Sequence, residues 1–170
     1  MEPSDIFAHL PRLYVEASRP GVTVIELGVR SGNSTAAFLL AAEENEGHVW
    51  SVDIHPPRVP WHGHDRWTFL QGDDLWLTSE LPDADVVFID TSHLYDQTQS
   101  ELELYVPKVR PGGVVLLHDT ELEQPDGAPP FPRFPVRVAV DEYCQENGLT
   151  VEYVPGCNGL GVIRIGGNGD

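Results

Sequence analysis

Two aspartates stand where two neighbouring strands are expected to end. Asp90 closes the apolar segment DVVFI, and Asp119 follows the apolar segment VVLLH. Because ligands bind at the carboxyl ends of strands in open α/β sheets, we expect both carboxylates in one crevice. Two such carboxylates can share Mg²⁺, and a cation held there would lower the pKa of a bound hydroxyl. The alternative is that Asp119 caps the following loop while Asp90 only contacts a cofactor or substrate.

Two histidines flank the same crevice. A neutral imidazole can accept a proton from a hydroxyl near pH 7. His93 lies on the loop after the strand that ends at Asp90, so we favour His93 as general base, with Asp90 beside it in the catalytic site. Alternation along the next strand places His118 on the face opposite to Asp119. We therefore expect His118 to be a packed, hydrogen-bonded side chain.

A glycine turn near the N-terminus, VTVIELGVRSGNST at residues 22–35, is the clearest sign of a ligand site. Its apolar run predicts a buried parallel strand, and Gly28 and Gly32 bracket the turn that follows. The next three residues, NST, offer side chains that could cap a helix. A strand, a glycine turn and a helix N-terminus together form a nucleotide-cofactor site.

The residues around this turn indicate which nucleotide it would bind. The spacing Gly28-x-x-x-Gly32 departs from the G-x-G-x-x-G of dinucleotide sites, with Arg30 in place of the middle glycine. Glu26 adds a carboxylate that would repel pyrophosphate. The amine, the sulfonium and the absence of phosphate in S-adenosylmethionine suit an acidic strand end better. Asp53, at the end of the next predicted strand, is placed to accept both ribose hydroxyls.

The composition narrows the class of protein. The net charge is −17, from 27 acidic and 10 basic side chains, which argues against nucleic acid and against anionic membranes as partners. No apolar run approaches the roughly 20 residues of a membrane span, and the N-terminus lacks the pattern of a signal peptide. Two cysteines cannot form a disulfide framework. We expect a cytoplasmic protein.

Helical and strand patterns alternate along the chain, which predicts a mostly parallel sheet with helices on both faces. The strands are expected at 22–29, 48–54, 67–71, 85–91, 114–118, 151–154 and 161–165. The helices are expected at 4–17 with an interruption near Pro11, and at 34–44, 96–109 and 136–147. The last two strands have no helix between them and should form an antiparallel hairpin. We expect one domain over residues 1–166 and a disordered tail at 167–170.

The glycine turn and the segment DVVFIDTSHLYDQTQSELELYVPKVRPGGVVLLHDT resemble class I S-adenosylmethionine-dependent methyltransferases. The branch that they resemble contains the small-molecule O-methyltransferases of the sugar and macrolide type, with relatives from cephalosporin clusters. The resemblance covers roughly residues 22–143. It implies an α/β, three-layer Rossmann-like fold with a seven-stranded sheet. It also implies transfer of a methyl group to a hydroxyl of a small-molecule acceptor.

The resemblance assigns roles to residues at the sheet edge. Asp73, and less surely Asp74, would lie along the adenine. Thr120 stands where metal-dependent relatives carry an Asn or a second Asp, and it is a weaker ligand. The expected metal ligands are Asp90, Asp119 and Thr120. The expected cofactor-binding residues are Glu26, Gly28, Arg30, Gly32, Asn33, Ser34, Asp53, Ile54, Gly72, Asp73 and Asp90.

Other functions stay open at this point. One is a non-catalytic domain that binds S-adenosylmethionine or another adenosine nucleotide as a sensor or scaffold. Another is a small NAD-dependent oxidoreductase, against which Glu26, the missing glycine and the absence of a Tyr-x-x-x-Lys pair all speak. The sequence names neither the acceptor nor the oligomeric state, and a homodimer is one arrangement to consider. The proline-rich loop at 121–135 is expected to wall the acceptor pocket.

Overall fold

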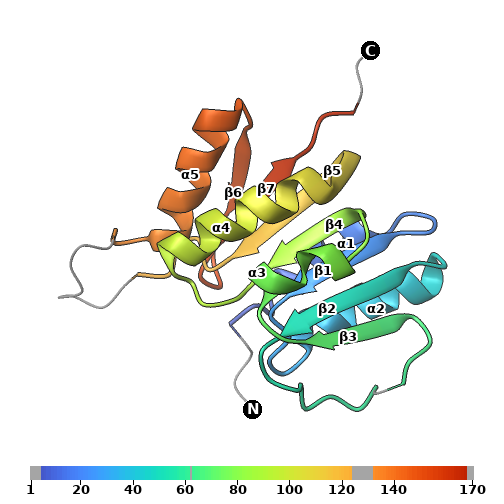
Figure 1. The fold of residues 1–170 in the computed structure, drawn as a ribbon. Helices are drawn as coiled ribbons and strands as arrows, with labels where there is room; N and C mark the ends of the chain where they lie inside the picture. The colour runs from blue at the N-terminus through green and yellow to red at the C-terminus, as the bar shows by residue number, and fades with distance from the viewer. Residues whose placement is uncertain (1–4, 62, 124–131, 168–170) are drawn as a thin grey trace.

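The computed structural model describes residues 5–61, 63–123 and 132–167, and one seven-stranded sheet organises them (Figure 1). The strand order is β3-β2-β1-β4-β5-β7-β6. The first five strands are parallel, β7 is antiparallel to β5, and β6 is antiparallel to β7. The strands are β1 (Thr23–Leu27), β2 (His48–Asp53), β3 (Trp67–Gln71), β4 (Ala84–Ile89), β5 (Val109–His118), β6 (Val151–Val154) and β7 (Leu160–Arg164). The predicted α/β class, parallel sheet and C-terminal hairpin are confirmed.

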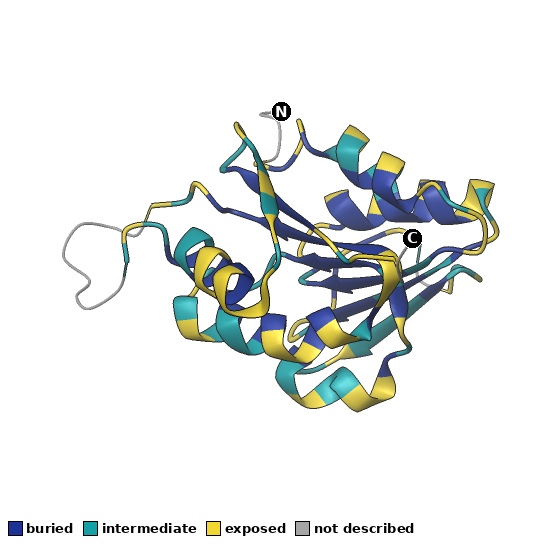
Figure 2. Ribbon diagram, turned by 90° about the horizontal axis from the view of Figure 1, so that it is seen from above, coloured by how far each residue is buried: buried dark blue, intermediate teal, exposed yellow. Residues whose placement is uncertain are grey.

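Helices cover both faces of the sheet, as Figure 2 shows from above. On one face α1 packs against α2, and on the other α4 contacts both α3 and α5. The helices are α1 (Leu10–Ala17), α2 (Asn33–Glu44), α3 (Asp74–Leu77), α4 (Tyr95–Tyr105) and α5 (Pro135–Asn147), with 3-10 turns η1 (Thr78–Glu80) and η2 (Val106–Lys108). The predicted three layers are present. None of the helices in the described ranges is both long and apolar enough to cross a bilayer.

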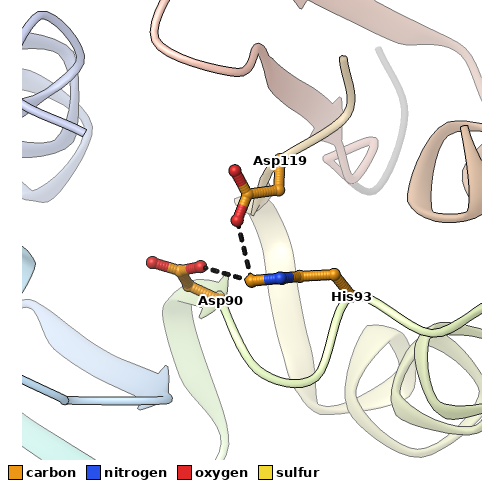
Figure 3. Close-up of side chains that lie close together, drawn as sticks. All are labelled: Asp90, His93 and Asp119. Carbon is orange, nitrogen blue, oxygen red and sulfur yellow. Dashed lines mark hydrogen bonds and ion pairs between the residues drawn. The ribbon is translucent and has the colours of Figure 1, made fainter. Parts of the chain in front are cut away.

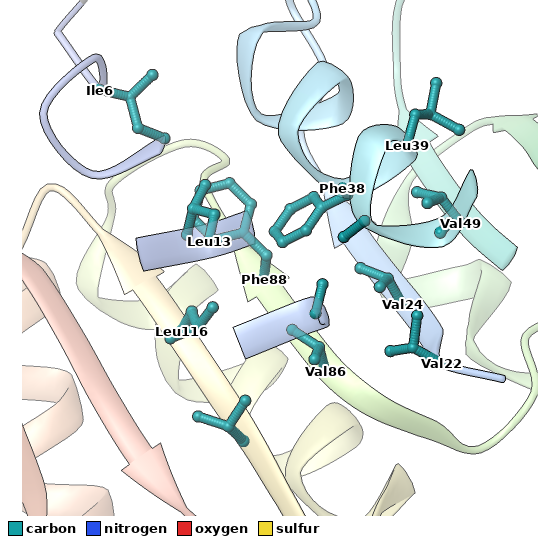
Figure 4. Close-up of a cluster of buried hydrophobic side chains, with 14 of the residues drawn as sticks. Ile6, Leu13, Val22, Val24, Phe38, Leu39, Val49, Val86, Phe88 and Leu116 are labelled. Carbon is teal, nitrogen blue, oxygen red and sulfur yellow. The ribbon is translucent and has the colours of Figure 1, made fainter. Parts of the chain in front are cut away.

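Alternation along the central strands divides the core into two layers. In β4, Val86 and Phe88 face the layer under α1 and α2, whereas Val87 and Ile89 face the layer under α4 and α5. Figure 4 shows the first layer, in which the rings of Phe38 and Phe88 lie 5.6 Å apart between centroids. Both faces of these strands are apolar because helices cover both sides of a parallel sheet.

The first helix begins later than its sequence pattern predicts. We expected a helix over 4–17 interrupted near Pro11, but α1 starts at Leu10 with the proline in its first turn. Proline has no N–H to contribute and a φ angle already suited to a helix, so it is favoured at that position. Pro11 therefore starts this helix rather than interrupting it. Residues 168–170 of the predicted tail lie outside the described residues.

The Pro111-Gly112-Gly113 segment is the second difference. We expected a turn there, but β5 continues through it from Val109, with a register shift where it pairs with β4. A Cβ on Gly113 would lie 2.7 Å from the carbonyl oxygen of Asp85 and 2.5 Å from Cγ1 of Val109. The glycine thus allows a close approach between two strands, which is a common role of strand glycine.

The buried Phe88 should be a main determinant of stability. Replacing it in F88A removes a fully buried ring and leaves a cavity beside Phe38, which costs about 3–5 kcal/mol of the free energy of unfolding. Urea denaturation measures this loss. The control is W76A, since Trp76 is 82% exposed and its removal should change stability by less than about 0.5 kcal/mol. Equal losses in both variants would contradict this view of the core.

Candidate active site

A pocket of about 430 Å³ opens at the carboxyl ends of β1, β2, β3 and β4. Seven of the predicted cofactor-binding residues line it, namely Gly28, Arg30, Asp53, Ile54, Gly72, Asp73 and Asp90. A second hollow is lined by Arg30 and Asp90 again, together with the predicted Asn33 and Ser34. The chain therefore brings most of the predicted residues to one edge of the sheet, where ligands of α/β proteins bind.

The turn after β1 fits closely against the end of β4. Gly28 has a φ angle of 88°, and a Cβ at this position would collide with the carbonyl oxygen of Asp90. The backbone N–H of Asp90 donates to the carbonyl of Leu27 at 2.9 Å. Only glycine has both the required φ and the required space here. The close fit places the Asp90 side chain beside the glycine turn.

Asp53 at the end of β2 holds the same turn in place. Its Oδ2 accepts hydrogen bonds from the backbone N–H groups of Val29 at 2.9 Å and Arg30 at 3.1 Å. Its Oδ1 accepts from the N–H of His55 at 2.8 Å. A carboxylate has about four acceptor positions, so Asp53 retains capacity for ligand hydroxyls. The predicted contact to a ribose remains compatible with this geometry.

Glu26 does not face the pocket, contrary to the expectation that it holds the amino-acid end of a ligand. Its side chain is 0% exposed, and it lines neither hollow. Its carboxylate accepts from the hydroxyls of Ser34 at 2.6 Å, Thr35 at 2.8 Å and Ser51 at 2.6 Å. Burial raises the pKa of Glu26 to about 7 against the lowering effect of these hydrogen bonds. Glu26 thus joins β1, β2 and α2 beneath the turn.

The start of α2 also differs from the sequence prediction. We expected one of the NST side chains to cap this helix, but the N-cap is Gly32 with a left-handed φ of 76°, and no side chain caps it. The hydroxyls of Ser34 and Thr35 point to Glu26 instead. Asn33 donates to Ser31. The sequence did not reveal this use because the partner carboxylate lies eight residues from Ser34 and nine from Thr35.

The adenine end of the predicted site is built around a helix start. Asp73 is the N-cap of α3, and its Oδ1 accepts from the N–H of Leu75 at 3.0 Å. A Cβ on Gly72 would lie 2.9 Å from Cδ1 of Leu77, so this position has little room for a side chain. Asp74 and Gln97 also line the pocket. Gln97 was not predicted, because a polar residue in a helix carries no motif that points to a ligand.

Asp90, His93 and Asp119 form one cluster, shown in Figure 3. Nε2 of His93 lies 2.7 Å from Oδ2 of Asp119 and 3.3 Å from Oδ1 of Asp90. Burial lowers the pKa of His93, but hydrogen bonds to the two carboxylates outweigh it and raise the pKa to about 9. In the cluster the histidine is therefore the positive partner of two negative charges at neutral pH.

His118 belongs to the same cluster, although strand alternation predicted otherwise. It is 1% exposed, and its Nε2 donates to the carbonyl of Cys157 at 2.8 Å, so the expected packed and hydrogen-bonded state is confirmed. Its Nδ1, however, lies 3.3 Å from Oδ1 of Asp119 and 3.6 Å from Oδ1 of Asp90. Asp119 has a φ of 61°, which ends the alternation of the strand. Its side chain consequently points back toward His118.

The cluster has the donor set of a divalent cation site. One oxygen of each carboxylate and one nitrogen of His93 lie within 4.8 Å of one another. Asp119 is 3% exposed, and its Oδ1 is buried without a hydrogen bond. Thr120 is fully buried, its Oγ1 also lacks a hydrogen bond, and a Cβ on Gly159 would lie 2.5 Å from that Oγ1. The carboxylates fit the prediction of a metal site, and the ligand role of Thr120 stays a prediction.

A known protein family matches the part of the chain that carries this site. A protein family described as "Methyltransferase domain" matches residues 25–120, more than half of the chain. A curated relative, the uncharacterized protein y4gI of Sinorhizobium fredii, is 29% identical in an alignment of 130 residues that covers 65% of this chain. The match spans only 14% of that relative's length.

Solved structures share the fold over nearly the whole chain. A Corynebacterium glutamicum protein has a TM-score of 0.76 at 20% identity, with 96% of this chain and 83% of that chain covered. The methyltransferase MycE of the mycinamycin biosynthetic pathway, in complex with Mg, SAH and mycinamycin VI, has a TM-score of 0.71 at 18% identity. That comparison covers 97% of this chain and 50% of MycE.

Because Gly28 packs closely against Asp90, adding one methyl group at position 28 should lower the stability of the fold strongly. We expect G28A to lower the free energy of unfolding by about 3 kcal/mol, because a left-handed φ and a collision act together. The control is G112A, whose φ is 82° but whose Cβ would meet nothing within 4 Å, so that only about 1 kcal/mol is expected. Similar losses in the two variants in chemical denaturation would contradict the close-fit account.

The raised pKa of Glu26 predicts how stability depends on pH. Glu26 keeps its proton to about pH 7 in the folded state, against a reference pKa of 4.5, so the folded state binds more protons between these values. Its contribution to stability is therefore full below pH 4.5 and is lost as the pH rises through about 7. The loss is on the order of 3 kcal/mol. Urea denaturation from pH 4.5 to 8 should show this fall in the wild type. In E26Q the fall should be smaller by that amount, with the part due to Glu101, whose pKa is raised to about 8, retained.

Proposed function

Because the chain belongs to this methyltransferase-domain family, we propose that it transfers a methyl group from S-adenosylmethionine to a hydroxyl of a small molecule. The single observation that carries the proposal is the position of the Asp90–His93–Asp119 cluster at the rim of the pocket. Asp90 and His93 line the pocket together with the glycine turn. A group that binds the donor and a group that accepts a proton are thus adjacent. The match spans only 14% of the length of y4gI, so the substrates of the whole protein are a question for experiment.

In this proposal the cofactor lies across the carboxyl ends of β1, β2 and β3. The Gly28–Gly32 turn binds the methionine end through backbone groups, with Asn33 and Ser34 beside it. Asp53 accepts the ribose hydroxyls, and Ile54, which is 59% exposed, packs against the adenosine. Gly72 and Asp73 lie along the adenine. The positive sulfonium and amine suit this pocket, which is lined by four aspartates at 53, 73, 74 and 90.

Methyl transfer requires that the acceptor oxygen, the methyl carbon and the sulfur are aligned, and that one group accepts the hydroxyl proton. The acceptor oxygen attacks the methyl carbon, and the C–S bond breaks with its electron pair on sulfur, which leaves S-adenosylhomocysteine. The hydroxyl proton passes to His93 after its imidazole has lost its own proton. Since the pKa of His93 is raised to about 9, this neutral form is the minor one at pH 7, and transfer should speed up as the pH rises toward 9. The carboxylates of Asp119 and Asp90 then stabilise the imidazolium that forms, as their distances of 2.7 and 3.3 Å to Nε2 allow. A role of this kind for carboxylates is known from catalytic triads.

A divalent cation fits the same site. Asp90 and Asp119 would hold it, and the observation that supports this is the set of ligand atoms of Asp90, His93 and Asp119 that lie within 4.8 Å of one another. Oδ1 of Asp119 is buried without a well-formed hydrogen bond, its polar neighbour being Nδ1 of His118 at 3.3 Å. When bound, the cation would act as a Lewis acid and lower the pKa of the acceptor hydroxyl. Mg²⁺ suits the carboxylates, whereas the imidazole of His93 would also suit transition metal ions. MycE was solved with Mg, and that fact supports the proposal only by analogy.

The proposal predicts that binding and turnover separate in variants of the cluster. Calorimetry should detect binding of S-adenosylhomocysteine to both the wild type and H93Q. Transfer of labelled methyl groups to a panel of hydroxylated acceptors should fall about 100-fold or more in H93Q, because the proton acceptor is lost. The control is H64Q, since His64 contacts Glu43 away from the pocket.

Each result bears on a different part of the proposal. Binding with no transfer to any acceptor in the wild type would favour a sensor or scaffold domain over an enzyme. Unchanged transfer in H93Q would remove His93 from its role as base. Absence of S-adenosylhomocysteine binding in the wild type would contradict the cofactor itself.

A further inference from the structure

Asp74, which lines the pocket, forms a pair of buried carboxyl groups with Glu101, which does not line it. Asp74 of α3 is 7% exposed and Glu101 of α4 is 0% exposed. The amide nitrogen of Gln97 donates to both, to Oδ1 of Asp74 at 3.2 Å and to Oε1 of Glu101 at 3.1 Å. The hydroxyl of Thr91 donates to the same Oε1 at 2.5 Å. These contacts join α3, α4 and the loop after β4.

The remaining oxygens of the two carboxyl groups explain their protonation state. Oδ2 of Asp74 and Oε2 of Glu101 are buried and find no other donor, while the two groups interact with each other. Burial raises the pKa of both, and the charge of Asp74 raises that of Glu101 further. One proton between Oε2 and Oδ2 would satisfy both oxygens and leave a single negative charge. Two ionised carboxylates at this place would be far more costly.

This arrangement fixes the orientation of the Gln97 amide. Both hydrogens of its Nε2 are used by Asp74 and Glu101, so the amide cannot be reversed without pointing its oxygen at two acceptors. Its Oε1 therefore stands on the opposite side of the group, and no described residue donates to it. Gln97 itself lines the pocket. The pocket lining thus includes an amide group whose orientation is set by two buried carboxyl groups.

We propose that Gln97 is a specificity-determining residue that accepts a hydrogen bond from the exocyclic amine of adenine, with Asp74 and Glu101 as its positioning residues. The inference rests on the proposed function, which puts adenine beside Gly72 and Asp73. Asp74 is the next residue along the chain, so its partner Gln97 lies at the same end of the pocket. An exocyclic amine is a donor that matches a fixed acceptor. A 6-oxo base would instead present an oxygen to Oε1, and it should be rejected.

The test compares two ligands on the same protein. S-adenosylhomocysteine and S-inosylhomocysteine differ in the amine and the oxo group at position 6 of the base. Calorimetry gives the ratio of their dissociation constants for each variant, and this ratio is insensitive to a partial loss of folded protein. We expect the wild type to prefer the adenine ligand by at least about tenfold. In Q97A the preference should fall about tenfold, chiefly through weaker binding of S-adenosylhomocysteine.

Two variants of Glu101 distinguish a loss of the Gln97 orientation from a general loss of structure. In E101Q the new amide can donate to Oδ2 of Asp74 while its oxygen still accepts from Thr91 and Gln97, so the preference should be retained. In E101L the acceptor that helps to fix Gln97 is lost, and the preference should fall. Q99A is the matched control on α4, because Gln99 contacts Tyr95 and the carbonyl of Ala139.

The outcomes distinguish this inference from the proposed function. A wild type that binds neither ligand contradicts the cofactor and the inference together. A wild type that prefers S-adenosylhomocysteine, with the same ratio kept in Q97A, overturns the inference alone and assigns the amine to another acceptor such as Asp73. A reduced ratio in Q99A equal to that in Q97A would also overturn it.

Discussion

The site depends on how closely the end of β1 can approach the end of β4. The absence of a side chain at Gly28 allows the glycine turn to lie against the carbonyl of Asp90, and the N–H of Asp90 bonds to Leu27. This contact puts the turn and the Asp90 side chain at one rim. From that rim the loop after β4 carries His93 to Asp119 at the end of β5. The glycine turn and the Asp90–His93–Asp119 cluster are therefore neighbours because the ends of β1 and β4 are in direct contact.

Acidic side chains stabilise this edge through hydrogen bonds, and all of those named here except the half-buried Asp53 are buried. Glu26 accepts hydrogen bonds from hydroxyls of one strand and one helix, and Asp53 accepts them from the backbone N–H groups of the turn. Asp74 and Glu101 hold the amide of Gln97. A net charge of −17 is thus more than a means of solubility, since several of the carboxyl groups are structural. Hydrogen bonds satisfy Glu26 and Asp53, and one proton shared between Asp74 and Glu101 would satisfy that pair, as burial of such groups requires.

The sequence predicted the fold well because its signals are local. Apolar runs, the glycine turn and the helix–strand alternation yielded the sheet, its hairpin and the family. The sequence also predicted that Asp53, Asp73, Asp90 and Asp119 lie at the carboxyl edge of the sheet, since ligand-binding residues of α/β sheets stand at strand ends.

The rest could not be predicted because it depends on contacts between distant segments. Left-handed backbone at His93 and Asp119 brings both side chains, and with them His118, into one cluster against simple alternation. The hydroxyls after Gly32 looked like helix caps until the position of Glu26 was known. Gln97 acquires a fixed direction only through two carboxyl groups that meet when α3 packs on α4.

The central claim is that the carboxyl edge of β1, β2 and β4 holds S-adenosylmethionine with its sulfur turned toward Asp90 and His93. A crystal structure with S-adenosylhomocysteine tests it most directly. The account predicts ribose hydroxyls on Asp53, adenine beside Gly72, and the sulfur at the rim shared by the glycine turn and the cluster. A ligand bound outside this edge, or bound with its sulfur remote from His93, would contradict the account.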